Sequence, residues 1–116
     1  MSNFTIATRI ATANPAVSVV DVTGSFDINT VVDFEVILED FFKKKQYKII
    51  LNFEKLTYVS SAGVGLLVGN LKEIRKNGGD IKIAGLTLEV YKVFELLELT
   101  KVFRIFKTEQ DAVSDY

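Results

Sequence analysis

The sequence predicts one α/β domain, spanning residues 1–116, in which helices pack on a mixed, mainly parallel β-sheet of about five strands. Short apolar runs rich in β-branched residues alternate with longer segments whose apolar residues recur at helical spacing. Asn14 and Pro15 separate two strand-like segments near the start, which predicts an antiparallel hairpin. With 116 residues, 48% of them hydrophobic, and no internal repeat, the chain has the size and composition of one domain.

The first third of the chain is expected to form the hairpin and a helix. Phe4 to Ile10 alternates with period two, and Val17 to Val22 is a β-branched strand that Gly24 is expected to close. From Asn29 to Lys45 the apolar residues recur at helical spacing, and Asn29 or Thr30 can cap the start of this helix. Three lysines lie at its C-terminal end, where cations oppose the helix dipole.

The remainder is expected to alternate strands and helices. Tyr47 to Phe53 is a short apolar run typical of a central strand that is buried on both faces. Leu56 to Ala62 then leads into a helix from Gly63 to Lys76, which Asn77-Gly78-Gly79 ends. Further on we expect a strand over 81–84, a helix over 88–97, a strand over 102–106 and a polar tail over 108–116 with room for a short helix. The expected order is β-β-α-β-α-β-α-β, with right-handed crossovers between the parallel strands.

Composition excludes several classes of function. The chain has no cysteine and no histidine, so it cannot build a disulfide framework, a thiolate zinc site or a Ser-His-Asp triad, and we expect no metal and no cofactor. Its 14 Lys and Arg against 15 Asp and Glu argue against binding to nucleic acid. Its apolar runs are too short to span a membrane, and the N-terminus lacks a secretory signal pattern. We therefore expect a soluble, cytoplasmic protein without membrane insertion.

The most informative segment lies where a predicted strand passes through a loop into a helix. Ser60 and Ser61 precede the apolar periodicity, and Gly63 and Gly65 leave room for close backbone approach. The plainest interpretation is that one serine caps the helix. A phosphate-binding loop is a weaker alternative, because Gly65 is followed by two leucines instead of a Lys-Ser/Thr pair. A serine nucleophile has less support still, because no histidine exists to deprotonate it.

An ordered set of segments covers nearly the whole chain. Thr23-Gly24-Ser25-Phe26-Asp27 looks like a Gly-x-Leu-Asp element, Ile50 to Phe53 like a central strand, and Val59 to Leu67 like a signature loop; Asn77 to Ile81 and Val93 to Leu99 provide later matches. Together they resemble the anti-sigma factor antagonists and their relatives with a STAS domain. The ordered set, more than any single short motif, is specific to that family.

The resemblance implies roles for individual residues. The family loop reads Asp-Ser-Ser/Thr/Ala-Gly-x-Gly, and its first serine, which corresponds to Ser61, is phosphorylated by a partner serine kinase that also serves as an anti-sigma factor. The family Asp falls on Ser60, so this loop lacks one carboxylate and Ser60 becomes a second possible acceptor. Asp27 looks like a partner contact, although a turn residue would serve equally well there. The expected contact surface consists of Asp27, Ser60, Ser61, Ala62, Gly63 and Val64.

The resemblance also implies a function through protein contact, not catalysis. The unmodified domain would bind an anti-sigma factor or serine protein kinase and so free a sigma factor; phosphorylation would end the contact, and a serine phosphatase would restore it. The alternative is a constitutive regulatory or structural STAS subunit, for example of a lipid or anion transport complex, in which Ser61 is never modified. The serine at position 60 favours this alternative. An enzyme or small-ligand module has only the glycine-containing loop in its favour.

Overall fold

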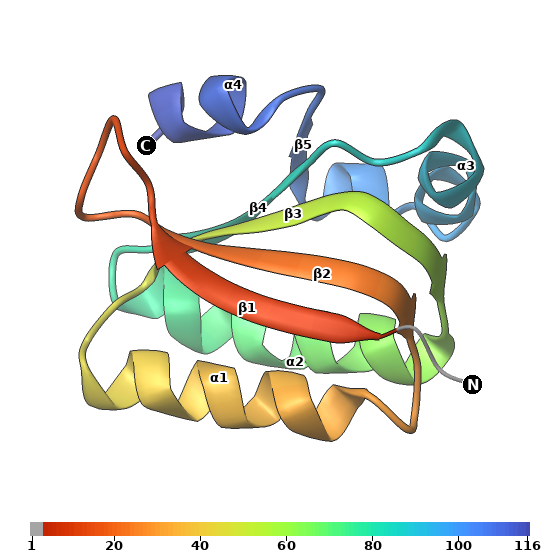
Figure 1. Cartoon of the computed structure of the whole chain (residues 1–116), viewed down its shortest axis with the longest axis horizontal. Helices are drawn as coiled ribbons and strands as arrows, with labels where there is room; N and C mark the ends of the chain where they lie inside the picture. Colours follow the sequence, from red (N-terminus) through yellow and green to blue (C-terminus); the bar gives the residue numbers. More distant parts are fainter. Residues whose placement is uncertain (1–3) are drawn as a thin grey trace.

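The computed structural model describes residues 4–116, which form a five-stranded sheet (Figure 1). The strands lie in the order β1-β2-β3-β4-β5, so each strand neighbours the next one along the chain. β1 and β2 pair antiparallel, and the other three pairs are parallel. The predicted mixed, mainly parallel sheet is confirmed. Its strands are β1 (Thr5–Ile10), β2 (Ser18–Phe26), β3 (Lys48–Val59), β4 (Asp80–Ala84) and β5 (Arg104–Phe106).

The helices lie on both faces of this sheet. α1 (Val31–Lys43) and α2 (Ser61–Lys76) run side by side over one face, and α4 (Glu109–Ser114) lies over the other (Figure 1). α3 (Leu88–Leu96) and a single 3-10 turn (Leu99–Lys101) connect β4 to β5. The predicted alternation of strands and helices is therefore observed, and the polar tail does form the short helix for which the sequence left room.

The main core fills the space between the sheet and the first two helices. The rings of Phe26 and Phe34 lie 5.2 Å apart and those of Phe26 and Phe53 lie 6.4 Å apart, measured between centroids. α1 buries the side of the helix that carries Phe34, as its apolar periodicity predicts. α2 buries Leu67, whereas the neighbouring Val68 is 42% exposed. Fixing α1 and α2 on this face places the N-terminus of α2 at the carboxyl end of the sheet.

A second, smaller core lies beneath α4. Ala112 and Val113 of this helix cover apolar residues of the sheet, among them Val19 and Ile50. Because α4 has only six residues, it buries little apolar area. Its attachment to the sheet therefore depends on polar contacts at both of its ends.

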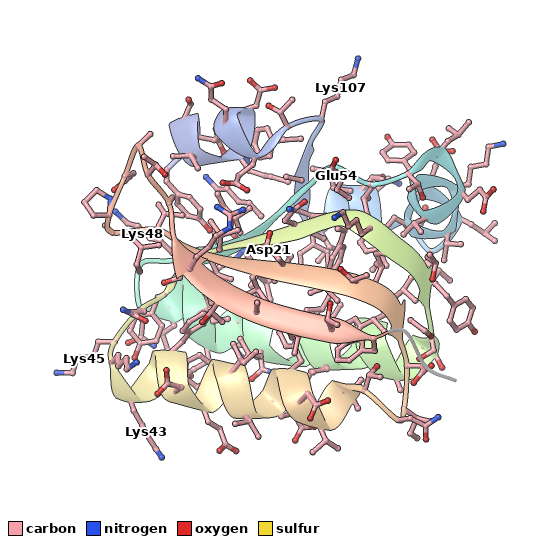
Figure 2. The ribbon with its side chains drawn as sticks, in the orientation of Figure 1. Asp21, Lys43, Lys45, Lys48, Glu54 and Lys107 are labelled. Carbon is pink, nitrogen blue, oxygen red and sulfur yellow. The ribbon has the colours of Figure 1, made fainter. Side chains whose placement is uncertain are left out.

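Ion pairs hold both ends of α4 to the sheet. Near its start, Arg9 of β1 donates to Glu109 at 2.8 Å and to Asp21 of β2 at 2.7 Å. Just after its end, the buried Lys82 donates from Nζ to Asp115 Oδ2 at 2.7 Å, and Arg104 donates to the same carboxylate at 2.6 Å. Asp21, labelled in Figure 2, lies on the same side of the sheet as α4. With Tyr116 included, these polar contacts join the end of the chain to β1, β3, β4 and β5 directly and to β2 through Arg9.

Tyr116 makes the remaining contacts between the end of the chain and the sheet. Its hydroxyl accepts from the Ile49 N–H of β3 at 3.0 Å and lies 2.6 Å from the carbonyl oxygens of both Ile49 and Asp80. Its ring lies 3.8 Å from Lys82 Nζ, a cation–π contact. Burial raises the pKa of this phenol well above its ordinary value, so Tyr116 stays protonated and can donate at physiological pH.

Several element boundaries differ from those predicted. β2 does not end at Gly24 but continues to Phe26; Gly24 lies within the strand, with a positive φ of 95°, next to a register shift. β3 extends as far as Val59 and pairs with β2 through two register shifts, which are bulges. Bulges bend a strand, and Figure 1 shows the end of β3 curving towards α2. α2 consequently begins at Ser61, two residues earlier than predicted, and β5 is shorter than predicted.

Acid is expected to weaken the attachment of α4. Lys82, together with Arg104, holds the pKa of Asp115 below its ordinary value of 3.8. A carboxyl group whose pKa is lowered on folding stabilises the folded state above its unfolded pKa, and this stabilisation is lost as the pH falls below it. We therefore expect Asp115→Asn to melt at a lower temperature than the parent at about pH 7, and the difference to shrink below about pH 4. Circular dichroism melts across this pH range measure it, and a difference that does not change with pH would contradict the prediction.

Candidate functional site

The candidate site forms where β2 and β3 end side by side. Phe26 is paired with Val59 in the parallel register, and the next residue of β3, Ser60, donates its N–H to the Phe26 carbonyl at 3.0 Å. Because both strands end at the same edge, the β2–α1 loop and the β3–α2 loop lie next to one another. Carboxyl ends of parallel strands are where sites form in open α/β sheets. Asp27 and Ser61, far apart in the sequence, are thereby brought to one corner of the molecule.

The structure distinguishes the two serines of the loop. Ser60 is the N-cap of α2: its backbone is extended (φ −96°, ψ 171°), and its Oγ accepts from the Gly63 N–H at 3.3 Å. Its carbonyl accepts from the Val64 N–H at 3.0 Å. Ser61 is the first helical residue; its side chain is exposed and makes no hydrogen bond within residues 4–116. The capping role therefore belongs to Ser60, which leaves the Ser61 hydroxyl available.

Asp27 is held in place by its own loop. Its carboxylate accepts from the Ser25 hydroxyl at 2.6 Å and from the Asn29 N–H at 2.9 Å, an Asx turn. Its carbonyl accepts from Thr30 and Val31, which starts α1. The Ser25 hydroxyl, followed by the backbone N–H of Asn29, holds the pKa of Asp27 below its ordinary value, so this carboxylate is ionised at neutral pH.

Two residues of this loop were not singled out for the site from the sequence. Ser25 orients the Asp27 carboxylate, and the buried Thr30 accepts from the Asp27 N–H at 2.9 Å while it donates to the Ser25 carbonyl at 2.8 Å. Thr30 was proposed as a helix cap, and it does occupy that position, but its side chain bonds back to the loop and not to the helix. The spacing Ser-x-Asp-x-x-Thr is the signal that could have found this arrangement.

The six predicted contact residues are not equally accessible. Ser61 is exposed, whereas Gly63 is buried and offers no side chain to a partner. Val64 is half-buried and packs against the main core. The other three, Asp27, Ser60 and Ala62, are half-buried at the surface. The accessible part of the predicted surface is thus centred on Ser61.

The first turn of α2 has the electrostatics of an anion-tolerant position. It contains no acidic residue, and Ser60 stands immediately before it. The first N–H groups of a helix lack intrahelical acceptors, and the helix dipole is positive at this end. An added negative charge on the Ser61 side chain would therefore meet favourable backbone dipoles within its own helix.

Neither a metal site nor a membrane-spanning helix is found in the part of the chain that the structure describes. Residues 4–116 contain no group of three or more Asp or Glu side chains placed to hold a metal ion. None of the helices described is both long enough and apolar enough to cross a membrane.

Comparison with known proteins identifies relatives over most of the chain. A family model for the STAS domain matches residues 8–112. An anti-sigma-B factor antagonist from Staphylococcus aureus is 30% identical over 86 residues, which cover 74% of this chain and 80% of the relative.

Solved structures share the fold. An anti-sigma factor antagonist from Mycobacterium paratuberculosis superimposes with a TM-score of 0.84 at 19% identity, covering 97% of this chain and 93% of that one. The anti-sigma factor antagonist SpoIIAA in its unphosphorylated form gives a TM-score of 0.79 at 24% identity, covering 96% and 95%. The phosphorylated form of SpoIIAA, from Bacillus, gives 0.69 at 24% identity, covering 94% and 98%.

Substitution of the two glycines near the start of α2 should have opposite effects on stability. A Cβ on Gly63 would lie 2.8 Å from the Phe26 carbonyl oxygen and 2.9 Å from its ring, so Gly63→Ala should cost about 1 to 3 kcal/mol. A Cβ on Gly65 meets nothing within 4 Å, so the sequence-based expectation that Gly65 also allows a close approach was wrong. Gly65→Ala should stabilise the helix by about 0.5 to 1 kcal/mol. Urea unfolding of the pair measures both, and equal effects would contradict the assignment.

Ser60→Ala and Ser61→Ala should differ in stability, because the Ser60 side chain caps α2 and the Ser61 side chain is exposed. Losing the Ser60 cap should cost about 0.5 to 2 kcal/mol of unfolding free energy. Losing the exposed Ser61 hydroxyl should change it by less than about 0.5 kcal/mol. Both effects are measured as shifts in the urea midpoint of unfolding, with the slope of the unfolding free energy against urea concentration unchanged. The reverse ranking would show that Ser61, not Ser60, caps the helix.

Proposed function

Because this chain belongs to the STAS domain family, we propose that it acts as an anti-sigma factor antagonist whose binding is controlled at Ser61. In this proposal the unmodified domain binds an anti-sigma factor and so frees a sigma factor. Phosphorylation of Ser61 ends the contact. The observation that carries the proposal is the exposed, unbonded hydroxyl of Ser61 at the first position of α2, beside the fixed Asp27 loop.

The geometry favours Ser61 over Ser60 as the phosphate acceptor. A kinase needs a hydroxyl that can enter its active site, and Ser61 is exposed and has no hydrogen bond among residues 4–116 to give up. Ser60 is half-buried, and its Oγ accepts from the Gly63 N–H. Phosphorylation at Ser60 would therefore also change the cap of α2, because it esterifies the oxygen that accepts from Gly63. The two sites consequently differ in their expected effect on folding.

The same geometry explains how a phosphate could change binding without changing the fold. A phosphate adds about −1.5 to −2 charge at pH 7. On Ser61 this charge would lie at the positive end of the α2 dipole, where an anion is stabilising. A partner surface shaped for a neutral hydroxyl would instead have to bury the new charge beside the ionised Asp27. Binding, and not stability, is thus the property that the modification would alter.

The proposed role implies a set of partners. The kinase would be a serine protein kinase that also serves as the anti-sigma factor, and a serine phosphatase would reverse its action. Asp27 would contact the partner through its carboxylate, with Ala62 and the exposed part of the loop around it. The domain would act by protein contact without catalysis or a cofactor, in the cytoplasm where sigma factors work. Ser60 in place of the family Asp keeps one alternative, a constitutive STAS subunit that is never phosphorylated.

Ser61→Asp should weaken partner binding strongly and leave the melting temperature nearly unchanged. At the helix N-terminus a carboxylate is worth roughly 0.3 to 1 kcal/mol to the isolated domain. Buried unpaired in the complex, it costs on the order of 3 to 5 kcal/mol, a loss of roughly two to three and a half decades in affinity. Isothermal titration against the anti-sigma factor of the same organism, with thermal melts alongside, measures both quantities.

Ser61→Ala is the matched control for this substitution. It keeps a small neutral side chain, so it should bind the anti-sigma factor as the parent does and resist the kinase. Equal affinities for Ser61→Asp and Ser61→Ala would show that this loop is not the switch, and would favour the constitutive subunit.

A further inference from the structure

The outer side of α1 carries apolar residues that the folded chain does not bury. Ile28, Val32 and Val36 are 72%, 59% and 61% exposed. They follow one another at intervals of four residues, so they lie along one side of the helix and of the turn that leads into it. The opposite side of α1 faces the main core with Phe34 and Leu38.

Acidic side chains border this apolar line on both sides. At about 100° per residue, Glu35 and Glu39 fall on one side of the two valines and Asp33 and Asp40 fall on the other. All four are exposed. Asp40 pairs with Lys44 at 3.0 Å, whereas the other three form no ion pair within residues 4–116. We refer to Ile28, Val32 and Val36 with their flanking Asp33, Glu35 and Glu39 as the α1 ridge.

No burial among residues 4–116 accounts for the valines of the α1 ridge. Valine loses rotamer freedom in a helix and is a poorer helix former than alanine, and at an exposed position no burial compensates. Figure 2 shows Lys43, seven residues beyond Val36 and on the same side of α1, pointing away from the sheet. This side of the helix is therefore open to a partner.

The α1 ridge is continuous with the Ser61 loop. Ile28 follows Asp27 directly, and Asp27 follows Phe26, whose carbonyl accepts from Ser60 at 3.0 Å. α1 and α2 also lie side by side on the same face of the sheet (Figure 1). A partner seated on the Ser61 loop therefore meets Ile28 first and the valines next.

We propose that the α1 ridge extends the partner surface of the Ser61 loop, and that the anti-sigma factor receives it in an apolar groove bordered by lysine or arginine side chains. Charge complementarity determines this choice of occupant. The α1 ridge presents unpaired carboxylates beside apolar side chains, so a matching partner surface presents cations beside apolar side chains. A second copy of the chain is the competing occupant, and the oligomeric state measured below distinguishes it from the anti-sigma factor. The inference rests on the proposed function and adds the chemistry of the partner.

The test compares two variants of the ridge with one control. Val32→Ser/Val36→Ser removes the apolar line, and Asp33→Asn/Glu35→Gln/Glu39→Gln removes the unpaired carboxylates. Ile10→Ser removes an apolar side chain, 49% exposed, at the opposite end of the sheet. Isothermal titration against the purified anti-sigma factor should show about a tenfold loss of affinity or more for the apolar variant and no loss for the control. The charge variant should lose affinity at low salt and much less at high salt.

Thermal melts and light scattering complete the experiment. All variants are expected to melt close to the parent, because the substituted side chains are exposed, and to remain in its oligomeric state. Parental affinity for both ridge variants, with binding still abolished by Ser61→Asp, would overturn the inference and leave the proposed function standing. A parent protein that does not bind the anti-sigma factor would overturn both. Self-association that Val32→Ser/Val36→Ser abolishes would show that a second copy covers the ridge, and would likewise overturn the inference.

Discussion

The hydrogen bond from the Ser60 N–H to the Phe26 carbonyl determines where every part of the candidate site lies. It joins the end of β3 to the end of β2, and it places Gly63 so close to Phe26 that no side chain fits between them. α2 must then begin at once, which puts Ser61 at its first position. The same contact fixes Asp27 beside the loop, since Asp27 follows Phe26 directly. Loop, helix start and acidic turn are therefore consequences of one junction.

Charge is divided unequally between the two sides of this junction. The α2 side carries hydroxyls, glycines and backbone N–H groups, with no carboxylate in the first turn. The α1 side carries the ionised Asp27 and then the acidic outer side of α1. Position 60 is a serine, so the β3–α2 loop has no carboxylate near Ser61. The negative charge near Ser61 therefore comes from the β2–α1 loop. A modification at Ser61 would thus place charge on the side that has none.

The sequence was sufficient for the order of strands and helices, because periodicity of the apolar residues directly reports which face of an element is buried. It also placed Ser61 where a strand passes into a helix, whereas Asp27 was assigned through the family resemblance, and the extension of β2 to Phe26 is what brings Asp27 to the same edge of the sheet. It did not reveal that β3 continues to Val59, because two bulges interrupt the alternation that marks a strand. Nor did it reveal the ion pair that attaches α4 to the sheet, because Arg9 and Glu109 are 100 positions apart in the sequence. Contacts of that kind depend on tertiary placement and leave no local pattern.

The sheet order has a consequence for synthesis on the ribosome. Because each strand pairs with its sequence neighbour, the sheet can assemble progressively as the chain emerges, and α1 and α2 can close one face early. The opposite face, including Val19 and Ile50, is covered only when α4 has been made, and Tyr116 is needed to engage Ile49. Until then a patch of central sheet remains open to solvent. While the last residues are still being made, chaperones or premature association would therefore act on that face and not on the side bearing Ser61.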